Sequence, residues 1–270
     1  MAVFGSSSPP LPVILLTDFG MADPFVGQVK GVLMRLFPKV TIVDLFHDIP
    51  PFAIKSGAWM LERCLPHMPS PAIWLCIVDP GVGGGRRGLA VQSEGSYFIG
   101  PDNGLLTPVL NRPDARVLSL DTLGDGESVS PTFHGRDLFA PAAASLLQGR
   151  SLSDLGTPLI DPPVLLADPV WRKAGHGAWR TEVLFIDHYG NLVTGLPGEE
   201  LRKRPVKGWL DGTPCGAIVT TFASVPVGAP ALVVGGFGTV EVVINQGSAA
   251  NHFQRGLGAE VMIRLDGGEG

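Results

Sequence analysis

The stretch Val78-Asp79-Pro80-Gly81-Val82-Gly83-Gly84-Gly85-Arg86-Arg87 decides how the fold is predicted. It follows an apolar run over residues 72–78, a pattern typical of a strand that is buried on both faces. Ligands of open α/β sheets bind just outside the carboxyl ends of strands, where Asp79 would lie. Glycines let the backbone approach a ligand, and Arg86 and Arg87 return positive charge toward the acid. A surface turn with an ordinary ion pair is the alternative, but the buried strand end favours a functional site.

The composition indicates a folded protein that does not bind nucleic acid. Its 270 residues are 45% hydrophobic and 17% charged, with 36 glycines and 25 prolines, as expected for a turn-rich globular protein. The formal net charge of -5 and the absence of a basic cluster argue against a nucleic-acid partner.

The cysteines and the first apolar run bear on the compartment. Cys64, Cys76 and Cys215 are isolated in the sequence, so we expect buried thiols in a reducing cytoplasm rather than disulfides or zinc ligands. The apolar run over residues 13–16 follows no basic region and is too short for a signal or membrane segment. The prediction is therefore a cytoplasmic protein without a membrane partner.

The first half of the chain alternates strand and helix patterns. Buried strands are predicted over residues 12–16, 40–46 and 72–78, and helices over 25–36 and 53–65. This βαβαβ order predicts a mostly parallel sheet with right-handed crossovers. Asp23-Pro24 is typical of a helix N-cap followed by proline. Beyond the glycine loop we expect a hairpin over 89–99, a strand over 116–120 and a helix over 138–147.

The second half contains short strands separated by glycine and proline. Residues 158–177 are rich in Pro, Asp and Gly, as a linker would be. The strand spacing after them predicts a small barrel or sandwich. The predicted strands cover residues 181–186, 192–196, 217–221, 231–234, 240–244 and 261–265. We therefore expect an α/β domain over 1–165 and a smaller all-β domain over 178–270.

Several common chemistries lack their motifs. The glycines that follow Asp79 miss the third position of a dinucleotide-binding fingerprint, and neither a Walker sequence nor a Gly-x-Ser-x-Gly elbow is present. His47-Asp48 and the pair His134 and Asp137 could ligate a metal, but neither forms a dense cluster, so no metal site is predicted. His47 could equally be a turn or capping residue.

Six motifs occur in an order that resembles a known family. They are Thr17-Asp18-Phe19-Gly20, the loop over 79–87, Pro101-Asp102-Asn103-Gly104, Thr132-Phe133-His134-Gly135-Arg136-Asp137, Asp187-His188-Tyr189-Gly190-Asn191 and Asn245-Gln246-Gly247-Ser248-Ala249. The chain resembles the adenosine-forming S-adenosyl-L-methionine (SAM) hydrolases, or SAM hydroxide adenosyltransferases, which are related to fluorinases and chlorinases. The resemblance implies an N-terminal α/β sandwich domain, a C-terminal β-barrel domain, and a homotrimer with active sites between one subunit's N-terminal domain and the next subunit's C-terminal domain.

The reaction implied by this resemblance is displacement of L-methionine from the ribose C5′ of SAM by water or hydroxide, which releases adenosine. The sulfonium leaving group needs no general acid, but the nucleophile must be positioned and desolvated. By resemblance, Asp79, Arg86 and His134 are the catalytic residues. Asp79 and His134 can accept or relay a proton, and Arg86 stays protonated and can stabilise hydroxide. SAM is the substrate, and no cofactor is implied.

Five residues match the family's substrate-binding positions. By resemblance, Asp18 holds the ribose hydroxyls and Phe52 forms an aromatic wall beside the sulfonium. Asp187 pairs with the methionine ammonium, Tyr189 stacks on adenine where Phe is usual, and Asn191 hydrogen-bonds to adenine. Without the family, Phe52 and Tyr189 would be interpreted as core aromatics and Asn191 as a turn residue.

Two positions separate the main alternative functions, and a third departs from the family pattern. Halide-using adenosyltransferases are the main alternative, but they carry an aromatic residue where Asp79 stands and Ser where Gly135 stands. A non-catalytic SAM- or adenosine-binding protein would not need the catalytic residues, all of which are present. Family members commonly carry Ser at the position of Gly236, so a hydroxyl contact to the methionine carboxylate does not carry over to this chain.

Overall fold

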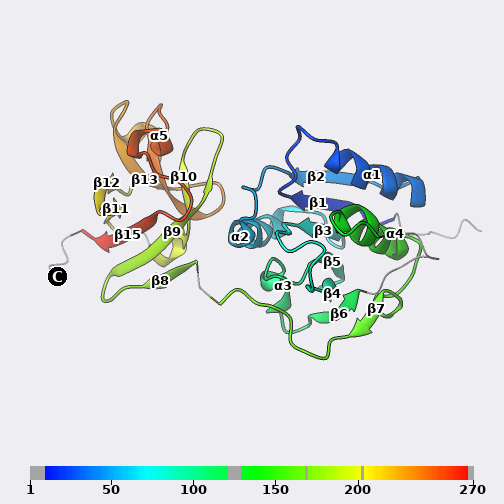
Figure 1. Cartoon of the computed structure of the whole chain (residues 1–270). Helices are drawn as coiled ribbons and strands as arrows, with labels where there is room; N and C mark the ends of the chain where they lie inside the picture. The colour runs from blue at the N-terminus through cyan, green and yellow to red at the C-terminus, as the bar shows by residue number, and fades with distance from the viewer. Residues whose placement is uncertain (1–9, 121–128, 168–169, 202–203, 267–270) are drawn as a thin grey trace, which may run out of the picture. The chain divides into compact units, whose positions relative to one another are not determined.

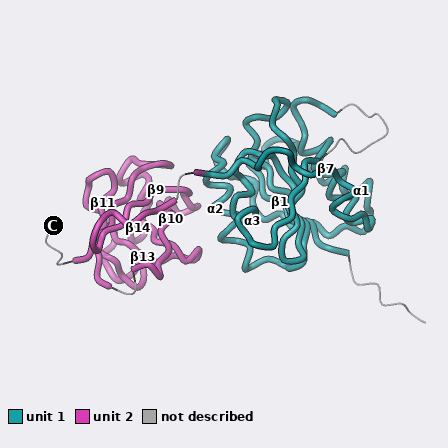
Figure 2. The backbone as a smooth tube through the Cα atoms, turned by 90° about the horizontal axis from the view of Figure 1, so that it is seen from below, with its two compact units in different colours: residues 1–166 teal, residues 167–270 magenta. Residues whose placement is uncertain are grey.

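The chain forms two compact units, residues 1–166 and residues 167–270 (Figure 2). The computed structural model describes residues 10–120, 129–167, 170–201 and 204–266. The first unit is mixed α/β and the second is antiparallel β, which confirms the predicted fold class. No helix in the described ranges combines the length and the apolar character that crossing a membrane requires.

The sheet of the first unit has seven strands in the order β2-β1-β3-β5-β4-β6-β7. The neighbouring pairs β2-β1, β1-β3 and β3-β5 are parallel, and β4, β6 and β7 add antiparallel pairs. The strands are β1 (Val13–Thr17), β2 (Ile42–Phe46), β3 (Ile73–Ile77), β4 (Gly88–Ser93), β5 (Ser96–Pro101), β6 (Arg116–Leu120) and β7 (Gly156–Pro158). Every residue of β1 and β3 is buried, which explains their uninterrupted apolar sequences.

Helices cover both faces of this sheet. Figure 1 shows α1 and α4 on one side and α2 and α3 on the other. The helices are α1 (Phe25–Leu36), α2 (Ile54–Cys64), α3 (Thr107–Leu110) and α4 (Ala140–Leu147), and the π-helical turn η2 (Gly135–Phe139) leads into α4. The N-cap prediction at Asp23 is wrong. Pro24 occupies that position, and its carbonyl accepts the first helical hydrogen bond, from Gln28 N at 2.9 Å.

The second unit is a nearly closed antiparallel barrel. Its strand order is β12-β11-β15-β9-β10-β14-β13, with β8 added at β9. An isolated bridge between Ile218 and Leu232 brings the two ends of this order together. The strands are β8 (Trp171–Lys173), β9 (Ala178–Ile186), β10 (Leu192–Pro197), β11 (Val206–Leu210), β12 (Thr213–Ala217), β13 (Pro230–Val234), β14 (Thr239–Ile244) and β15 (Glu260–Leu265).

The strand predicted over 217–221 is wrong, because the strand in this region ends at Ala217. Asp211 and Gly212 form a two-residue hairpin loop with φ angles of 45° and 80°, which pairs β11 with β12 from Thr213 onward. The Asp-Gly pair is a strong hairpin signal, and it places the strand four residues earlier than the apolar pattern does. β8 was also missed, since its three residues lie inside the predicted linker.

Candidate active site

Two acids meet at the carboxyl edge of the first sheet. Because β1 and β3 are parallel neighbours, Asp18 and Asp79 follow their strands at the same edge. The Asp18 N–H donates to the Ile77 carbonyl at 3.2 Å, which ties the two strand ends together. A cavity of about 260 Å³ opens here. Its wall includes both carboxyl groups, His134 and the aromatic residues Phe19, Phe25, Phe52 and Phe133.

Arg86 joins Asp79 to His134. Its Nε donates to Asp79 Oδ1 at 2.8 Å, and its Nη2 donates both to Asp79 Oδ2 and to His134 Nδ1, the latter at 2.9 Å. The Arg86 and Asp79 side chains are only 10% and 7% exposed. A buried bidentate pair of this kind is geometrically specific. The structure therefore brings the three predicted catalytic residues into one chain of hydrogen bonds.

The contact with Arg86 fixes the tautomer of His134. A guanidinium group only donates hydrogen bonds, so Nδ1 is the acceptor and the proton of the neutral ring is on Nε2. Burial lowers the pKa of His134 below its usual value, and the positive charge of Arg86 lowers it further. The imidazole is therefore neutral at pH 7, and Nε2–H is its remaining polar group. In this arrangement the ring offers a hydrogen-bond donor and has no free basic nitrogen.

Arg86 stands behind the cavity wall. Four of its five N–H groups are used, three by Asp79 and His134 and one by the Arg87 carbonyl at 3.3 Å. Its guanidinium also lies 5.4 Å from the centroid of the Phe139 ring. Within the described ranges, the cavity lining includes Asp79 and His134 and not Arg86. Arg86 can thus orient these two side chains and offset the charge of Asp79 from behind.

Gly83 and Gly135 are required by close packing at this site. Gly83 has φ +75°, and a Cβ there would lie 2.0 Å from the Pro131 carbonyl oxygen. The glycine loop therefore touches the segment that carries His134. At Gly135 a Cβ would lie 3.1 Å from Phe19 Cζ and 3.2 Å from Ile77 Cδ1. A serine at 135 would require these two side chains to move by a few tenths of an ångström, so the wall accommodates glycine more easily.

Asp18 is connected directly to Phe52. The Phe52 N–H donates to Asp18 Oδ2 at 3.0 Å, and Phe52 has a left-handed φ of 68°. Such a conformation is strained for a bulky residue, so it persists only where neighbouring contacts hold it. The Phe52 ring is 70% exposed beside the cavity rather than part of the core. The pKa of Asp18 lies above its usual value. Burial raises it most, the hydrogen bond from the Phe52 N–H partly offsets this, and the charge of Asp79 raises it further.

Arg87 has a different role. Its Nε donates to Asp102 Oδ2 at 2.8 Å, and its two terminal nitrogens donate to the carbonyls of Asp161 and Pro162, each at 3.0 Å. The other Asp102 oxygen accepts from Val164 N at 2.8 Å. Arg87 and Asp102 therefore hold the segment around residues 161–164 against the sheet edge.

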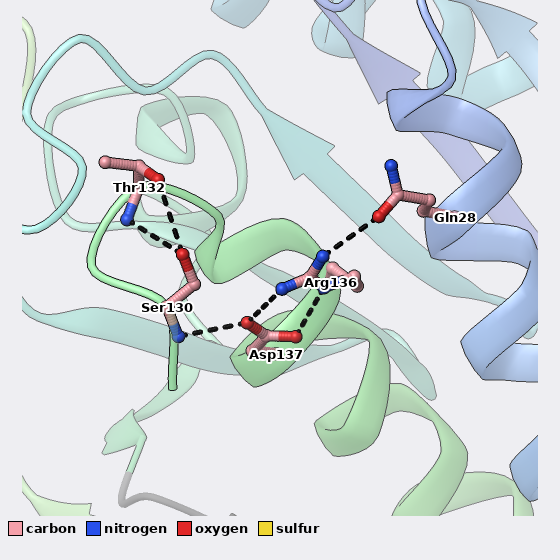
Figure 3. A network of polar contacts seen from close by, with 5 residues as sticks. All are labelled: Gln28, Ser130, Thr132, Arg136 and Asp137. Carbon is pink, nitrogen blue, oxygen red and sulfur yellow. Dashed lines mark hydrogen bonds and ion pairs between the residues drawn. The ribbon is translucent and has the colours of Figure 1, made fainter. Parts of the chain in front are cut away.

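The two histidine motifs considered for metal binding are satisfied by other partners. His47 is buried between Thr17 Oγ1 at 2.8 Å and Asp44 Oδ1 at 3.0 Å, and thus supports the end of β1. Asp137 binds Arg136 and accepts from Ser130 N at 3.0 Å (Figure 3). In the described part of the chain, no three His, Cys, Asp or Glu side chains gather in a way that could hold a metal.

The network in Figure 3 positions the segment that precedes His134. Arg136 donates to Gln28 Oε1 on α1 at 2.9 Å, and it pairs with Asp137 through two nitrogens. Asp137 in turn holds Ser130, whose hydroxyl lies 3.3 Å from that of Thr132. The segment is thereby fastened to α1 on one side, while Gly83 contacts it on the other.

The other predicted binding residues lie in the turn between β9 and β10. Asp187 Oδ1 accepts from the backbone N–H groups of Tyr189 and Asn191 at 2.9 Å each, and Asp187 Oδ2 accepts from Asn191 Nδ2 at 2.8 Å. Asn191 is 5% exposed, whereas the Tyr189 ring is 76% exposed. Asp187 and Asn191 are therefore bound to each other, and Tyr189 presents a free ring face.

This turn borders a second cavity, of about 1010 Å³, within the second unit. Gly190 has φ +83°, and a Cβ there would lie 2.1 Å from Ser248 Oγ, so the turn packs directly on the loop before α5 (Ala249–Phe253). Gly236 also lines the cavity, and a Cβ at this position would meet nothing within 4 Å. A serine at position 236, as in other family members, would therefore fit without a steric clash.

Glu241 and Ser248 line this cavity and were given no role by the sequence analysis. Glu241 lies in β14 with its side chain at the cavity, and Ser248 lies opposite the Asp187 turn. The signal for Glu241 was present, because a carboxylate inside the apolar run Val240 to Ile244 is unusual for a barrel strand. The signal for Ser248 was weaker, since a serine before a short helix is commonly just an N-cap, a role that it also has here.

Comparison with known proteins agrees with this architecture. Residues 13–156 match the SAM hydroxide adenosyltransferase N-terminal domain, and residues 181–262 match the C-terminal domain of the same family. A (R)-S-adenosyl-L-methionine hydrolase of Thermus thermophilus is 39% identical, over 94% of this chain and 99% of its own. A (R)-S-adenosyl-L-methionine hydrolase of Salinispora tropica is 38% identical, over 87% of this chain and 90% of its own. A fluorinase of Actinoplanes sp. is 28% identical, over 71% of this chain and 74% of its own.

Solved structures show the same fold. An uncharacterized conserved protein from Thermotoga maritima matches with a TM-score of 0.83 and 28% identity, over 93% of this chain and 99% of its own. A conserved hypothetical protein from Thermus thermophilus matches with a TM-score of 0.76 and 36% identity, over 95% and 100%.

Proposed function

Because the chain belongs to the SAM hydroxide adenosyltransferase family, we propose that it hydrolyses S-adenosyl-L-methionine to adenosine and L-methionine. One observation carries the proposal. The buried chain Asp79–Arg86–His134 presents a carboxylate and a neutral imidazole at the wall of a small aromatic cavity. Such a site can orient a water molecule and exclude bulk solvent from it, as displacement at carbon requires.

In the proposed reaction a water oxygen attacks the ribose C5′ as the C5′–S bond breaks. The bonding electron pair returns to sulfur and leaves methionine as a neutral thioether, so no group needs to protonate it. The attacking water loses one proton, which Asp79 can accept. His134 donates through Nε2–H and orients the oxygen, and Arg86 holds both partners in place. This chemistry needs no cofactor.

Substrate binding is divided between the two units in this proposal. Asp18 lies in the cavity of the first unit and can accept hydrogen bonds from the ribose hydroxyls, while Phe52 offers its exposed ring to the sulfonium. In the second unit, Tyr189 can stack on adenine, and Asn191 keeps its amide oxygen for hydrogen bonding. Asp187 pairs with the methionine ammonium.

We propose that these two halves meet between neighbouring subunits of a cytoplasmic homotrimer. The proposal is tested by mixing inactive Asp79→Ala subunits with inactive Asn191→Ala subunits. An intersubunit site regenerates some intact sites after exchange, so activity returns. If exchange is verified by mass spectrometry and no activity returns, the site is built within one chain.

The reaction is tested by incubating the pure protein with SAM, with and without chloride, and identifying the nucleoside product. Adenosine in both samples supports the proposal. A chlorinated deoxyadenosine that forms only with chloride would instead identify a halide-using transferase. Binding of SAM without any product would identify a non-catalytic binding protein.

A further inference from the structure

Glu241 is a buried carboxyl group that the described residues leave without a hydrogen-bond partner. It is 4% exposed in β14, and Val193 on β10 and Val233 on β13 lie directly opposite it. Burial and the charge of Asp187 act on its carboxyl group, and no hydrogen bond or cation from the described residues does. Burying a carboxyl group without such partners is unfavourable. The carboxyl group opens onto the cavity of the second unit, where a group from outside the chain can reach it.

The carboxyl group of Glu241 faces the cavity of the second unit. It lies directly over the Cα of Gly235, because a Cβ at that position would be 1.6 Å from Glu241 Oε1. Gly235 therefore makes room for this carboxyl group. Glu241 and Asp187 both line the same cavity of about 1010 Å³.

The two acids of this cavity differ in their surroundings. Asp187 accepts three hydrogen bonds from its own turn. Glu241 accepts none, and burial raises its pKa to about 7, with a further contribution from the negative charge of Asp187. The residues facing it from β10 and β13 are valines, and Asp187 is the described charged group that acts on it. At neutral pH Glu241 is therefore about half protonated.

We propose that Glu241 and Asp187 together receive the primary ammonium of an amino-acid ligand, and that binding expels the proton held by Glu241. The inference rests on the proposed function, which supplies the α-ammonium of SAM as that group. The ammonium keeps its three protons, the Glu241 carboxyl group becomes a carboxylate, and the released proton goes to solvent. A charge-assisted hydrogen bond then replaces the missing partner of Glu241.

Hydrolysis of SAM itself releases a proton, so the decisive measurement uses a SAM analogue that keeps the amino group but has carbon in place of sulfur and cannot be cleaved. It is titrated calorimetrically into the full-length wild-type protein in two buffers of different ionisation enthalpy. At about pH 6, where a group of this pKa is mostly protonated, we expect release of roughly half a proton or more per site, and at about pH 9 almost none. The same uncleavable analogue without its amino group should bind without this release. These measurements need no variant, so a folding defect cannot obscure them.

Glu241→Gln provides the second arm, with Glu260→Gln as the matched control on β15 of the same unit. We expect Glu241→Gln to abolish the proton release and raise KM about tenfold near pH 8, as loss of one charge-assisted hydrogen bond implies, with kcat within about twofold of wild type. Glu260 pairs with Arg180 on the barrel strands, and its replacement should leave KM unchanged.

The outcomes separate this inference from the function on which it rests. If the wild type binds the uncleavable analogue but releases no proton at about pH 6, or releases just as much with the analogue that lacks the amino group, the role of Glu241 is wrong and the hydrolase proposal stands. If the wild type binds no SAM, the proposed function fails, and this inference fails with it.

Discussion

The backbone N–H of Phe52 donates to Asp18 Oδ2 at 3.0 Å, and Phe52 is held at a left-handed φ of 68°. The same carboxyl group that is proposed to bind the ribose thus also holds the strained residue that carries the aromatic wall. A ligand that engages Asp18 would act on the position of Phe52 through one hydrogen bond. Ribose recognition and placement of the ring are therefore coupled by geometry.

This relationship predicts different effects for two replacements of Phe52. Phe52→Ala and Phe52→Gly both remove the ring, so KM for SAM should rise by a similar factor, roughly threefold to tenfold, as loss of a cation–π contact implies. Glycine adopts positive φ without strain, so Phe52→Gly should be about 1 kcal/mol more stable than Phe52→Ala. Chemical denaturation and steady-state kinetics measure the two effects. Equal stability of the two variants would show that the left-handed backbone stores no strain.

Gly83 and Gly85 offer a matched pair in one loop. Gly83→Ala places a Cβ 2.0 Å from the Pro131 carbonyl oxygen at a positive φ, whereas a Cβ at Gly85 meets nothing within 4 Å. We expect Gly83→Ala to lower the free energy of unfolding by at least about 2 kcal/mol and to reduce kcat, because the loop must move away from the segment that carries His134. Gly85→Ala should resemble the wild type in both measurements. Similar stability of the two variants in thermal unfolding would contradict the proposed packing role of Gly83.

Much of the first unit follows from its sequence pattern. Uninterrupted apolar runs such as residues 72–78 predict strands buried on both faces, and parallel strands place the acids that follow them at one sheet edge. Asp18 and Asp79 could therefore be placed without any relative. The contact between Arg86 and His134 could not, because 48 residues separate them, and only the family resemblance brought them together. A pattern of burial gives the face of a strand but not its long-range polar partners.

The second unit was harder to predict because turns, rather than apolar runs, decide where its strands begin. The Asp211-Gly212 turn determines where β12 begins, whereas the apolar pattern led to a strand predicted over residues 217–221. Glu241 was passed over because β14 was interpreted only as a hydrophobic strand. Its significance depends on Gly235, across the β13–β14 hairpin, and on Asp187, which lies in the same cavity but is distant in the sequence.

Glu241 also predicts how stability depends on pH. Its pKa rises on folding from the usual 4.5 to about 7, so its contribution to stability is present below pH 4.5 and is lost as pH rises through about 7. Glu241→Gln cannot ionise and should escape this loss. The melting temperature of Glu241→Gln minus that of the wild type should therefore increase by several degrees from about pH 5 to about pH 8. A difference that stays constant across this range, as expected for the control Glu260→Gln, would show that Glu241 is already ionised in the folded protein.

The final prediction separates chemistry from binding at Asp79. Asp79→Asn keeps the size of the side chain but removes the charge, and it turns one hydrogen-bond acceptor into a donor that faces Arg86. Because Asp18, Phe52 and Asp187 remain, SAM affinity should change little, whereas turnover should fall about 100-fold or more, the scale of a positioned acid–base group. Arg86→Lys keeps one charge and loses the planar fork, so intermediate turnover is expected. Asp102→Asn is the matched control, since it breaks an Asp–Arg pair outside the cavity and should lower stability without lowering kcat. Calorimetric SAM binding beside single-turnover hydrolysis decides the matter: if Asp79→Asn hydrolyses SAM near the wild-type rate, Asp79 only anchors the loop.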